Sequence, residues 1–420
     1  MKKVYEITGK SKIKGTIKIQ GSKNSALAII VASLLCKDIV FLENVPRIKD
    51  VFELLAILKK INVKYSFVEN TLMIDSSTIT YEKLLFDEVK QFRASYYFIG
   101  VFIALFKKVE IYLPGGCNIG HRPIDQHIKG LSALGVEINI KDGIFIASCN
   151  NILGKDIFLD IPSVGATINI LLASVASLTP VIIKNAAREP EIVDLINFLN
   201  SMNANIVGQG SGVVSIYPIK ELKKTSYCIM PDRIVAGTYL LYGALLAEKL
   251  TLTNIVTKDI YSLINTLINL GVEMDIKKDS ITVYKVESFS HTNIKTGVFP
   301  EFPSDLQQIL SVFLLSGEGV SFVEESIFEN RFLFLKEIEK MDGRYFVFDN
   351  KAVIIPSKLK ASNVKVKDLR GGAALLLACM CASGTSTIED VFYIERGYEN
   401  LIKVLQSVNV DIKEIEVYEA

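Results

Sequence analysis

One pattern recurs six times along the chain and limits the folds it can adopt. An amphipathic helical segment leads to a short junction flanked by apolar residues, and an alternating strand hairpin follows. Two clear copies read "LSALGVEINIKDGIFIAS" and "LINLGVEMDIKKDSITVY". The junctions are centred about 70 residues apart, at Val63, Val136, Ala204, Val272, Gly343 and Val410.

A second pattern lies between these copies. Segments such as "NSALAIIVASLLCKDIVFLENV" and "GGAALLLACMCASGTSTIEDV" predict a helix that is apolar on nearly every face, followed by a strand. Such a helix must be enclosed by other elements, whereas the amphipathic helix belongs outside. Six copies group naturally as three plus three, which favours two similar α/β domains. A single open α/β sheet is the alternative.

Bulk composition excludes several classes of protein. The 420 residues carry 47 basic and 46 acidic side chains, so a charge of +1 predicts neither nucleic-acid nor anionic-membrane binding. The six cysteines form no CxxC pair, which argues against a disulfide scaffold or a zinc site. The N-terminus shows no signal peptide, and the apolar runs are shorter than the roughly 20 residues that span a bilayer. We expect a soluble cytoplasmic protein.

Basic residues stand at the starts of four predicted apolar helices: Lys23, Arg93, Arg233 and Arg370. A cation at a helix N-terminus opposes the helix dipole unless an anion binds there. One such residue is an ordinary loop cation. Four in a repeated architecture indicate anion sites, because arginine matches carboxylate and phosphate bidentately.

Three further segments have both a structural and a functional interpretation. Arg331 and Arg396 each have a carboxylate nearby, Glu329 and Glu395, so a weak surface ion pair explains either one alone. Asp305 in "EFPSDLQQ" reads as a helix cap or, among arginines, as a base. The stretch "NAAREPEIVD" is ordinary capping around a proline at a helix start.

Cys117 differs from the other thiols. It lies in "LPGGCNIGHRPIDQH", where glycines make it accessible and Arg122 favours the thiolate, whereas Cys36, Cys379 and Cys381 lie in apolar helices. A Cys-His-Asn triad with His127 is conceivable, but proximity in sequence is poor support for one.

Together these stretches resemble one family, the UDP-N-acetylglucosamine 1-carboxyvinyltransferases. The motifs run in family order along the whole chain: "GSKNSAL", "NVPRIKDV", "FRASYY", "PGGCNIGHRPIDQHI", "PSVGATINI", "NAAREPEIVD", "PDRIVAGT", "FPSDLQ", "FENRF", "DLRGGAAL" and "IERGYENL". The cysteine loop and "NAAREPEIVD" are the specific ones. The departures are Ser304 for threonine, Val235 for glutamate, Glu301 for a small residue, and the glycines Gly371 and Gly372, which would soften the segment carrying Arg370.

The resemblance implies two inside-out α/β domains, each a threefold repeat with buried helices surrounded by sheet. One domain would comprise residues 23–230, and the other residues 1–22 with 231–420. The active-site cleft would lie between them. The family transfers the enolpyruvyl group of phosphoenolpyruvate to the 3′-hydroxyl of UDP-N-acetylglucosamine, the first committed step of peptidoglycan synthesis, and is the target of fosfomycin.

Residue by residue, the resemblance also implies roles. Cys117 matches the proton donor and Asp305 the group that takes the hydroxyl proton, with Lys23 and Arg396 also catalytic. The matches to the phosphoenolpyruvate site are Lys23, Asn24, Arg122, Arg331, Arg370 and Arg396. The matches to the sugar-nucleotide site are Arg93, Arg122, Pro123, Ile124, Asp125, Gln126, Ser163, Val164, Asp305 and Ile327. No metal or cofactor is implied, and the oligomeric state is not indicated.

Two competing functions stay open. The related transferase that acts on shikimate 3-phosphate shares the fold and the basic cluster, but lacks the loop cysteine. A non-catalytic sugar-nucleotide-binding paralogue would not need Cys117 and Asp305 together with the full basic set.

Overall fold

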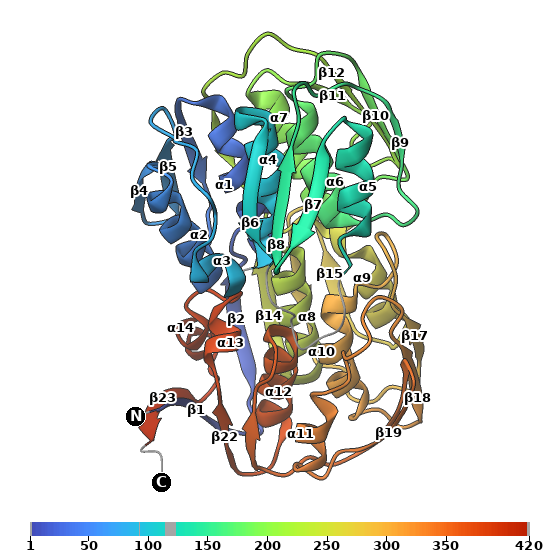
Figure 1. The fold of residues 1–420 in the computed structure, drawn as a ribbon. Coiled ribbons are helices and arrows are strands. Elements are labelled where there is room, and N and C mark those ends of the chain that lie inside the picture. Colours follow the sequence, from blue (N-terminus) through green and yellow to red (C-terminus); the bar gives the residue numbers. More distant parts are fainter. Residues whose placement is uncertain (1, 92, 114–122, 418–420) are drawn as a thin grey trace. The chain divides into compact units, whose positions relative to one another are not determined.

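The computed structural model describes residues 2–91, 93–113 and 123–417. They divide into two compact units (Figure 1). The first unit holds the described residues between 21 and 230, and the second holds residues 2–20 with 231–417. Cys117, Arg122 and their neighbours from 114 to 122 lie outside the described residues.

The first unit contains helices and strands in alternation. Its helices are α1 (Lys23–Ala32), η1 (Ser33–Cys36), α2 (Lys49–Lys60), α3 (Asp87–Gln91), η2 (Arg93–Tyr96), α4 (Tyr97–Phe106), α5 (Asp125–Ala133), α6 (Val164–Ser174) and α7 (Pro190–Ser201). Its strands are β3 (Ile39–Glu43), β4 (Lys64–Val68), β5 (Thr71–Asp75), β6 (Lys108–Tyr112), β7 (Glu137–Lys141), β8 (Ile144–Ser148), β9 (Asp156–Phe158), β10 (Val181–Lys184), β11 (Asn205–Val207), β12 (Val213–Tyr217) and β13 (Ser226–Cys228).

The second unit repeats this alternation. Its helices are α8 (Arg233–Leu246), η3 (Thr257–Ile260), α9 (Tyr261–Asn269), α10 (Ser304–Leu314), α11 (Leu335–Glu339), α12 (Leu369–Cys381), α13 (Phe392–Glu395) and α14 (Leu401–Ser407). Its strands are β1 (Lys2–Thr8), β2 (Ile13–Lys18), β14 (Ala247–Thr253), β15 (Met274–Ile276), β16 (Ser280–Val283), β17 (Asn293–Lys295), β18 (Ser321–Glu324), β19 (Arg344–Phe348), β20 (Lys351–Ile355), β21 (Asn363–Lys365), β22 (Thr385–Glu389) and β23 (Ile412–Val417).

The described strands form six small sheets, five of them mixed and one antiparallel, so the alternative of a single open sheet is wrong. Five sheets share one arrangement: a parallel pair, then two strands added antiparallel, as in β9-β10-β12-β11 and β2-β14-β16-β15. The sixth, β6-β8-β7, has three strands, and a parallel bridge from Leu84 to Ile111 stands where its fourth would be.

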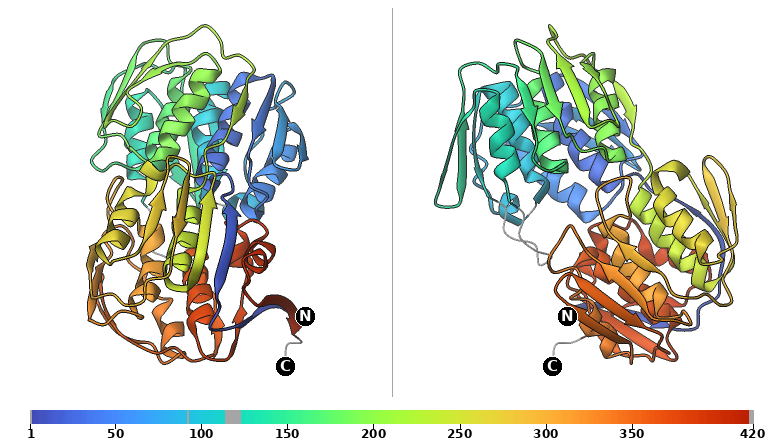
Figure 2. Two further views of the ribbon diagram at one scale, coloured as in Figure 1. Left: turned by 180° about the vertical axis from the view of Figure 1, so that it is seen from behind. Right: turned by 90° about the vertical axis from the view of Figure 1, so that its right-hand side faces the viewer.

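The last copy of the pattern is weak in sequence because its hairpin is completed from the other end of the chain. Strand β23 pairs antiparallel with β1, with Tyr5 opposite Glu414, and β1 also pairs with β22. Figure 2 shows the two chain ends side by side in the second unit. Residues 2–8 therefore belong with the C-terminal part of the chain.

The junctions of the repeat have a common backbone geometry. The residue before each centre has a positive φ, from 61° to 87°, and closes the preceding helix. These residues are Asn62, Gly135, Asn203, Gly271, Asp342 and Asn409. Glycine and asparagine are the residues that adopt this conformation most readily, and it is the usual way to end a helix before a strand.

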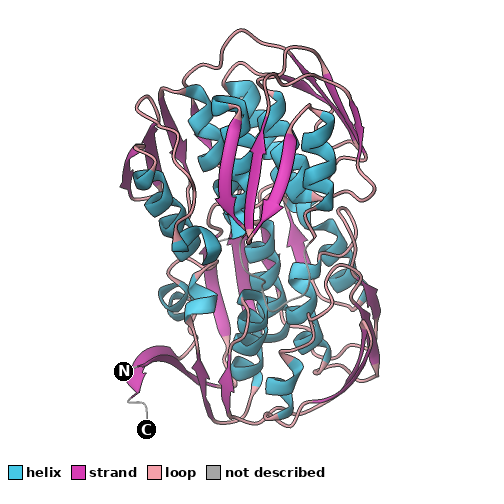
Figure 3. Ribbon diagram, in the orientation of Figure 1, coloured by secondary structure: helices cyan, strands magenta, loops and turns pink. Residues whose placement is uncertain are grey.

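The predicted apolar helices are the cores of the two units. Helices α1, α4 and α6 in the first unit, and α8, α10 and α12 in the second, are buried over nearly their whole length. Each unit has its own hydrophobic cluster, and strands lie around its helices (Figure 3). Among the described residues, no helix is long and apolar enough to cross a membrane.

Candidate active site

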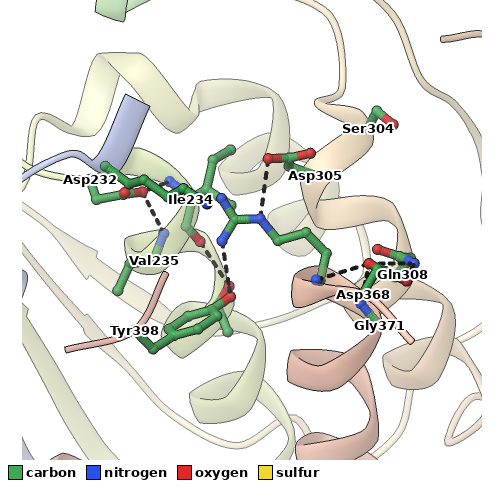
Figure 4. A network of polar contacts seen from close by, with 12 residues as sticks. Asp232, Ile234, Val235, Ser304, Asp305, Gln308, Asp368, Gly371 and Tyr398 are labelled. Carbon is green, nitrogen blue, oxygen red and sulfur yellow. Dashed lines mark hydrogen bonds and ion pairs between the residues drawn. The ribbon is translucent and has the colours of Figure 1, made fainter. Parts of the chain in front are cut away.

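Asp305 lies between two arginines at the start of α10. The helix begins at Ser304 after Pro303, which places Asp305 in its first turn. Arg331 Nη2 lies 2.5 Å from Asp305 Oδ1, and Arg370 Nε lies 3.1 Å from Oδ2. Each carboxylate oxygen therefore has its own guanidinium. Figure 4 shows the Asp305 carboxylate with a dashed contact from a guanidinium, and Gln308 beside Asp368.

This pairing decides the charge of Asp305. Burial acts to raise the pKa of its carboxyl group, but the guanidiniums of Arg370 and Arg331 outweigh that effect and bring the pKa well below its usual range. Asp305 is therefore ionised at neutral pH. Its side chain is 29% exposed, compared with 4% and 5% for the two arginines, so a ligand reaches the carboxylate more readily than the guanidiniums.

Arg370 is held by the cap of α12. Asp368 accepts hydrogen bonds from the backbone N–H groups of Arg370, at 3.0 Å, and of Gly371, at 2.9 Å. On its other side, Arg370 Nη1 donates to Tyr398 OH at 3.3 Å, and that hydroxyl lies 2.9 Å from Thr238 Oγ1. A residue that the dipole of α12 disfavours is thus fixed by neighbours on three elements.

The sequence suggested that the two glycines after Arg370 make this segment flexible, and that prediction is wrong. Both lie inside α12 and are buried. A Cβ on Gly372 would come within 2.5 Å of an Ile394 side-chain atom, and one on Gly371 within 2.8 Å of Asp368 Oδ2. They are close-packing positions that bring α13 and the cap carboxylate against the helix.

Arg331 is not the surface ion pair that its sequence neighbour suggested. Its partner is Asp305 rather than the exposed Glu329, and its guanidinium stacks 4.7 Å from the centre of the Phe328 ring. Its Nε is buried and has no hydrogen-bond partner among the described residues. A buried unsatisfied donor on a cation is costly, so this position favours an anion.

Glu325 organises the loop beside Arg331, and no sequence signal indicated it. Its buried carboxylate accepts from Thr296 Oγ1 at 3.0 Å, from Ser304 Oγ at 2.8 Å, and from the N–H groups of Ile327, at 2.8 Å, and Phe328, at 3.2 Å. This one side chain joins the start of α10 to the segment that carries Ile327. In the sequence, "VEESIFEN" resembles an ordinary acidic surface turn, so nothing distinguishes Glu325 from its acidic neighbours.

In the first unit, Lys23 is the first residue of α1, as predicted. Ser22 caps the helix by accepting from Ser25 N. Lys23 Nζ lies 2.7 Å from Asp50 Oδ2, and the Asp50 side chain is only 3% exposed. Asn24 is exposed at the same helix start. The ion pair fixes the lysine stem near the α1 N-terminus, where backbone N–H groups favour an anion.

Three residues predicted to bind the sugar nucleotide, Gln126, Ser163 and Val164, are brought together by α5 and α6. Gln126 Oε1 accepts from Asp160 N at 2.9 Å, and its Nε2 donates to Asp160 Oδ2 at 3.0 Å, which ties the start of α5 to the segment before α6. Ser163 caps α6, and Val164 is its first residue. Gln126 thus serves mainly to place the others.

His127 is a buried structural histidine in this arrangement. Asn169 Nδ2 lies 2.9 Å from His127 Nδ1, while Asn169 Oδ1 accepts from Gly100 N at 2.8 Å. Burial, aided by Arg93, lowers the pKa of His127 to about 4, against the effect of Asp125. The ring is therefore neutral and accepts at Nδ1. Because Nδ1 accepts from Asn169, the ring proton lies on Nε2, and with its lowered pKa His127 is a poor base for a nucleophile-activating triad.

The remaining predicted residues lie as follows. Arg93 begins η2 with its guanidinium 5.8 Å from the centre of the Tyr96 ring, and Arg396 follows α13, half-buried. Pro123, Ile124 and Asp125 lead into α5, and Ile327 is exposed. Cys117 and Arg122 lie outside the described residues. Among the described residues, no group of three or more His, Cys, Asp or Glu is arranged to hold a metal.

Comparisons with known proteins agree with this geometry. The sequence matches the family described as EPSP synthase (3-phosphoshikimate 1-carboxyvinyltransferase) over residues 7–405. An enolpyruvyl transferase of Streptomyces tendae has the same fold, with a TM-score of 0.89 at 21% identity over 99% of both chains. EPSP synthase of Acinetobacter baumannii has a TM-score of 0.76 at 13% identity, over 99% of this chain and all of that one. The chain therefore belongs to the EPSP synthase family.

Within that family, more similar relatives identify the group. UDP-N-acetylglucosamine 1-carboxyvinyltransferase 2 of Staphylococcus aureus is 42% identical over 410 residues, 97% of this chain and 98% of the relative. The protein of the same name from Listeria innocua is 40% identical over 407 residues, 97% and 96% of the two chains. The chain belongs with the UDP-N-acetylglucosamine 1-carboxyvinyltransferases, which confirms the family predicted from its motifs.

Proposed function

We propose that this protein transfers the enolpyruvyl group of phosphoenolpyruvate to the 3′-hydroxyl of UDP-N-acetylglucosamine and releases phosphate. The observation that carries the proposal is chain-long identity of 40–42% to transferases named for this reaction. The Asp305 cluster supports it independently, because an ionised carboxylate between two buried arginines suits a substrate that carries a carboxylate and a phosphate.

The proposed chemistry begins at the hydroxyl. Asp305 takes the proton of the 3′-hydroxyl as its oxygen attacks the central carbon of phosphoenolpyruvate, and Cys117 gives a proton to the methylene carbon. This addition yields a tetrahedral intermediate. The Cys117 thiolate then takes a proton back from the methyl carbon as phosphate leaves the central carbon with the proton held by Asp305, and the enol ether forms. Each residue thus moves a proton at a stated atom.

The low pKa of Asp305 bears on this role. A carboxylate held by two guanidiniums is a weak base. In the proposed complex, the carboxylate of phosphoenolpyruvate binds Arg331 and Arg370, which draws both cations away from Asp305. Its pKa then rises when the substrate is in place. The base becomes effective only in the complex that uses it.

The phosphate of phosphoenolpyruvate would be bound by Lys23, Arg122 and Arg396, with Asn24 beside Lys23. For the sugar nucleotide, we propose contacts from the starts of η2, α5 and α6 in the first unit and from Asp305 and Ile327 in the second. The cap of α6 supports this assignment, since Ser163 and Val164 stand at a helix N-terminus, which favours a diphosphate.

Three broader assignments accompany the proposal. We infer that each unit is a threefold repeat with its apolar helices enclosed, which the common sheet arrangement and six junctions support. We infer domains of residues 23–230 and of 1–22 with 231–420, each supplying substrate contacts. A cytoplasmic location is also proposed, because the substrates are charged metabolites and no described helix spans a membrane.

One incubation tests the function. The protein is mixed with phosphoenolpyruvate and either UDP-N-acetylglucosamine or shikimate 3-phosphate, and phosphate release is followed. We expect release with the sugar nucleotide alone. Release only with shikimate 3-phosphate would assign the other transferase activity, and release with neither would favour a non-catalytic paralogue.

A further inference from the structure

Gln308 is a buried amide in contact with the arginine pair, and none of the roles above includes it. It lies on α10, three residues after Asp305, and is 0% exposed. Positions three apart share one face of a helix, so Asp305 and Gln308 point to the same side. Figure 4 shows Gln308 next to Asp368.

The amide of Gln308 joins three segments of the second unit. Its Nε2 donates to the backbone carbonyl of Arg331 at 3.1 Å and lies 3.2 Å from Asp368 Oδ2. Its Oε1 accepts from Arg331 Nη1 at 3.4 Å. Asp368 in turn caps α12 at Arg370 N. The Gln308 side chain thus contacts both the main chain and the guanidinium of Arg331. It also contacts Asp368, which caps α12 and so places the backbone of Arg370.

Only an amide meets these demands at this length. A carbonyl and a carboxylate need a donor, whereas a guanidinium needs an acceptor, and glutamine supplies both from one planar group. Glutamate has no donor and would place a second acid against Asp368. Methionine fills the same space without either function.

We propose that Gln308 is a positioning residue that holds Arg331 and Arg370 in register, so that both guanidiniums bind one carboxylate. In the structure that carboxylate is Asp305, and in the reaction it is the carboxylate of phosphoenolpyruvate. The inference rests on the proposed function, because that function defines the second carboxylate. It predicts an effect on the binding of phosphoenolpyruvate rather than on the sugar nucleotide.

The test is Gln308→Met, with Gln308→Glu as a second variant should the first fold poorly. We expect the KM for phosphoenolpyruvate to rise about 10–100-fold, since a small misplacement of binding groups costs rate on that scale. The kcat and the KM for UDP-N-acetylglucosamine should stay close to those of the parent protein. A rise in one KM alone is the signature of lost binding that the ground and transition states share.

Gln307 is a matched control on the same helix. It is equally buried at 0% exposure, but its Nε2 reaches only Ser311 Oγ, at 3.4 Å, and its Oε1 has no partner among the described residues. Gln307→Met should leave the KM for phosphoenolpyruvate unchanged. Equal kinetic effects of the two methionine variants, or a fall in kcat alone, would make Gln308 an ordinary core residue.

A crystal structure of Gln308→Met separates this inference from the proposed function. We expect Arg331 or Arg370 to have left its oxygen of Asp305. Both contacts kept at their parent distances would overturn the positioning role, whatever the activity. Failure of the parent protein to release phosphate would instead overturn the proposed function, and the displaced arginine would still confirm the positioning.

Discussion

Two aspartates, the partly exposed Asp305 in the second unit and the buried Asp194 in the first, have opposite electrostatics. Asp305 faces two guanidiniums, and its pKa is lowered. Asp194, on α7, is 6% exposed, and burial raises its pKa despite hydrogen bonds from Ser25, Tyr227 and the backbone of Met230. Neutral donors therefore only partly offset desolvation, whereas cations reverse it.

The surroundings of Asp194 show what it does instead of chemistry. Ser25 Oγ makes a short hydrogen bond to Oδ2, Tyr227 OH donates to Oδ1 at 2.6 Å, and Met230 N donates to Oδ2 at 3.2 Å. Ser22 N in turn donates to Met230 O at 2.7 Å. Asp194 thus joins α7 to the first turn of α1 and to the last residue of the unit.

Under the proposed function, this difference separates a reactive carboxylate, Asp305, from an architectural one, Asp194. Both motifs, "FPSDLQ" and "NAAREPEIVD", looked like helix starts with acids in the sequence. The two aspartates differ in whether the side chains around them are cationic or neutral. Those neighbours come from distant parts of the chain, so only the packed structure shows which they are. The following predictions test whether the distinction holds.

The largest expected effect is on turnover. Asp305→Asn should lose about 10²–10⁴-fold in kcat, because an amide cannot accept the hydroxyl proton. Asp194→Asn should retain kcat within a few-fold and lose stability instead. Phosphate release and urea unfolding of both variants measure this. Near-parental turnover of Asp305→Asn would reduce Asp305 to a partner for two arginines.

The same contrast applies to thiols. Burial raises the pKa of Cys379 to about 12, as it raises the pKa of Asp194, so the Cys379 thiol stays protonated and unreactive at neutral pH. Cys117 is predicted to lie among cations, so fosfomycin should alkylate Cys117 alone, faster with bound sugar nucleotide. Mass spectrometry of the treated protein identifies the labelled residue.

Variants of this cysteine refine the prediction. Cys117→Asp should keep some activity and resist the epoxide, because a carboxylic acid also delivers a proton. Cys117→Ser should be much poorer, since a hydroxyl is a far weaker acid. Labelling spread over Cys36 or Cys149, or full activity of the serine variant, would make Cys117 a bystander.

Removing one cation from the phosphate side should have a smaller effect. Lys23→Ala and Arg396→Ala should each raise the KM for phosphoenolpyruvate about 10–100-fold, as expected for a lost hydrogen bond to a charged group. The melting temperature of Arg396→Ala should change little, whereas that of Lys23→Ala should fall, because the buried Asp50 loses its ion pair with Lys23. Arg344→Ala is a control, because Arg344 lies exposed on β19 and its guanidinium donates only to Pro356 O among the described residues. A KM equal to that of the control would remove either residue from the site.

The mixed α/β fold could be predicted from the sequence because the helix ends and the apolar helices are local features. Residues such as Asn62 and Gly271 end helices by their own conformation, and apolar helices announce their burial. The pairing of β1 with β23 has no local signal, because it joins the two ends of the chain. The resemblance implied that Arg331 binds phosphoenolpyruvate, which stays a prediction, whereas the residues alone suggested a surface ion pair.

Polar residues that act through others were harder to predict. Gln308 and Glu325 lie in segments whose periodicity reports only helix or turn. Their partners come from strands and loops up to 60 residues away, as between Gln308 and Asp368. Spacing along the chain carries no information on such contacts, so the second layer of the site became visible only in three dimensions.

The smallest effect is the pH dependence of stability, and its sign differs between the two aspartates. A lowered pKa in the folded state makes Asp305 stabilising above the unfolded pKa of about 4, and this stability is lost as pH falls through the folded value. A raised pKa makes the contribution of Asp194 most favourable below about pH 4, and it is lost as pH rises through the folded value.

The measurement is the free energy of unfolding of the parent protein minus that of each Asn variant, from urea titrations between about pH 3 and 8. For Asp305→Asn the difference should grow as pH rises, because the parent gains its two ion pairs. For Asp194→Asn it should shrink, because the parent must ionise a desolvated carboxyl while the amide stays neutral. Slopes of the same sign would show that hydrogen bonds from Ser25 and Tyr227 stabilise a carboxylate as effectively as two guanidiniums do. The division between a reactive and an architectural aspartate would then rest on position alone.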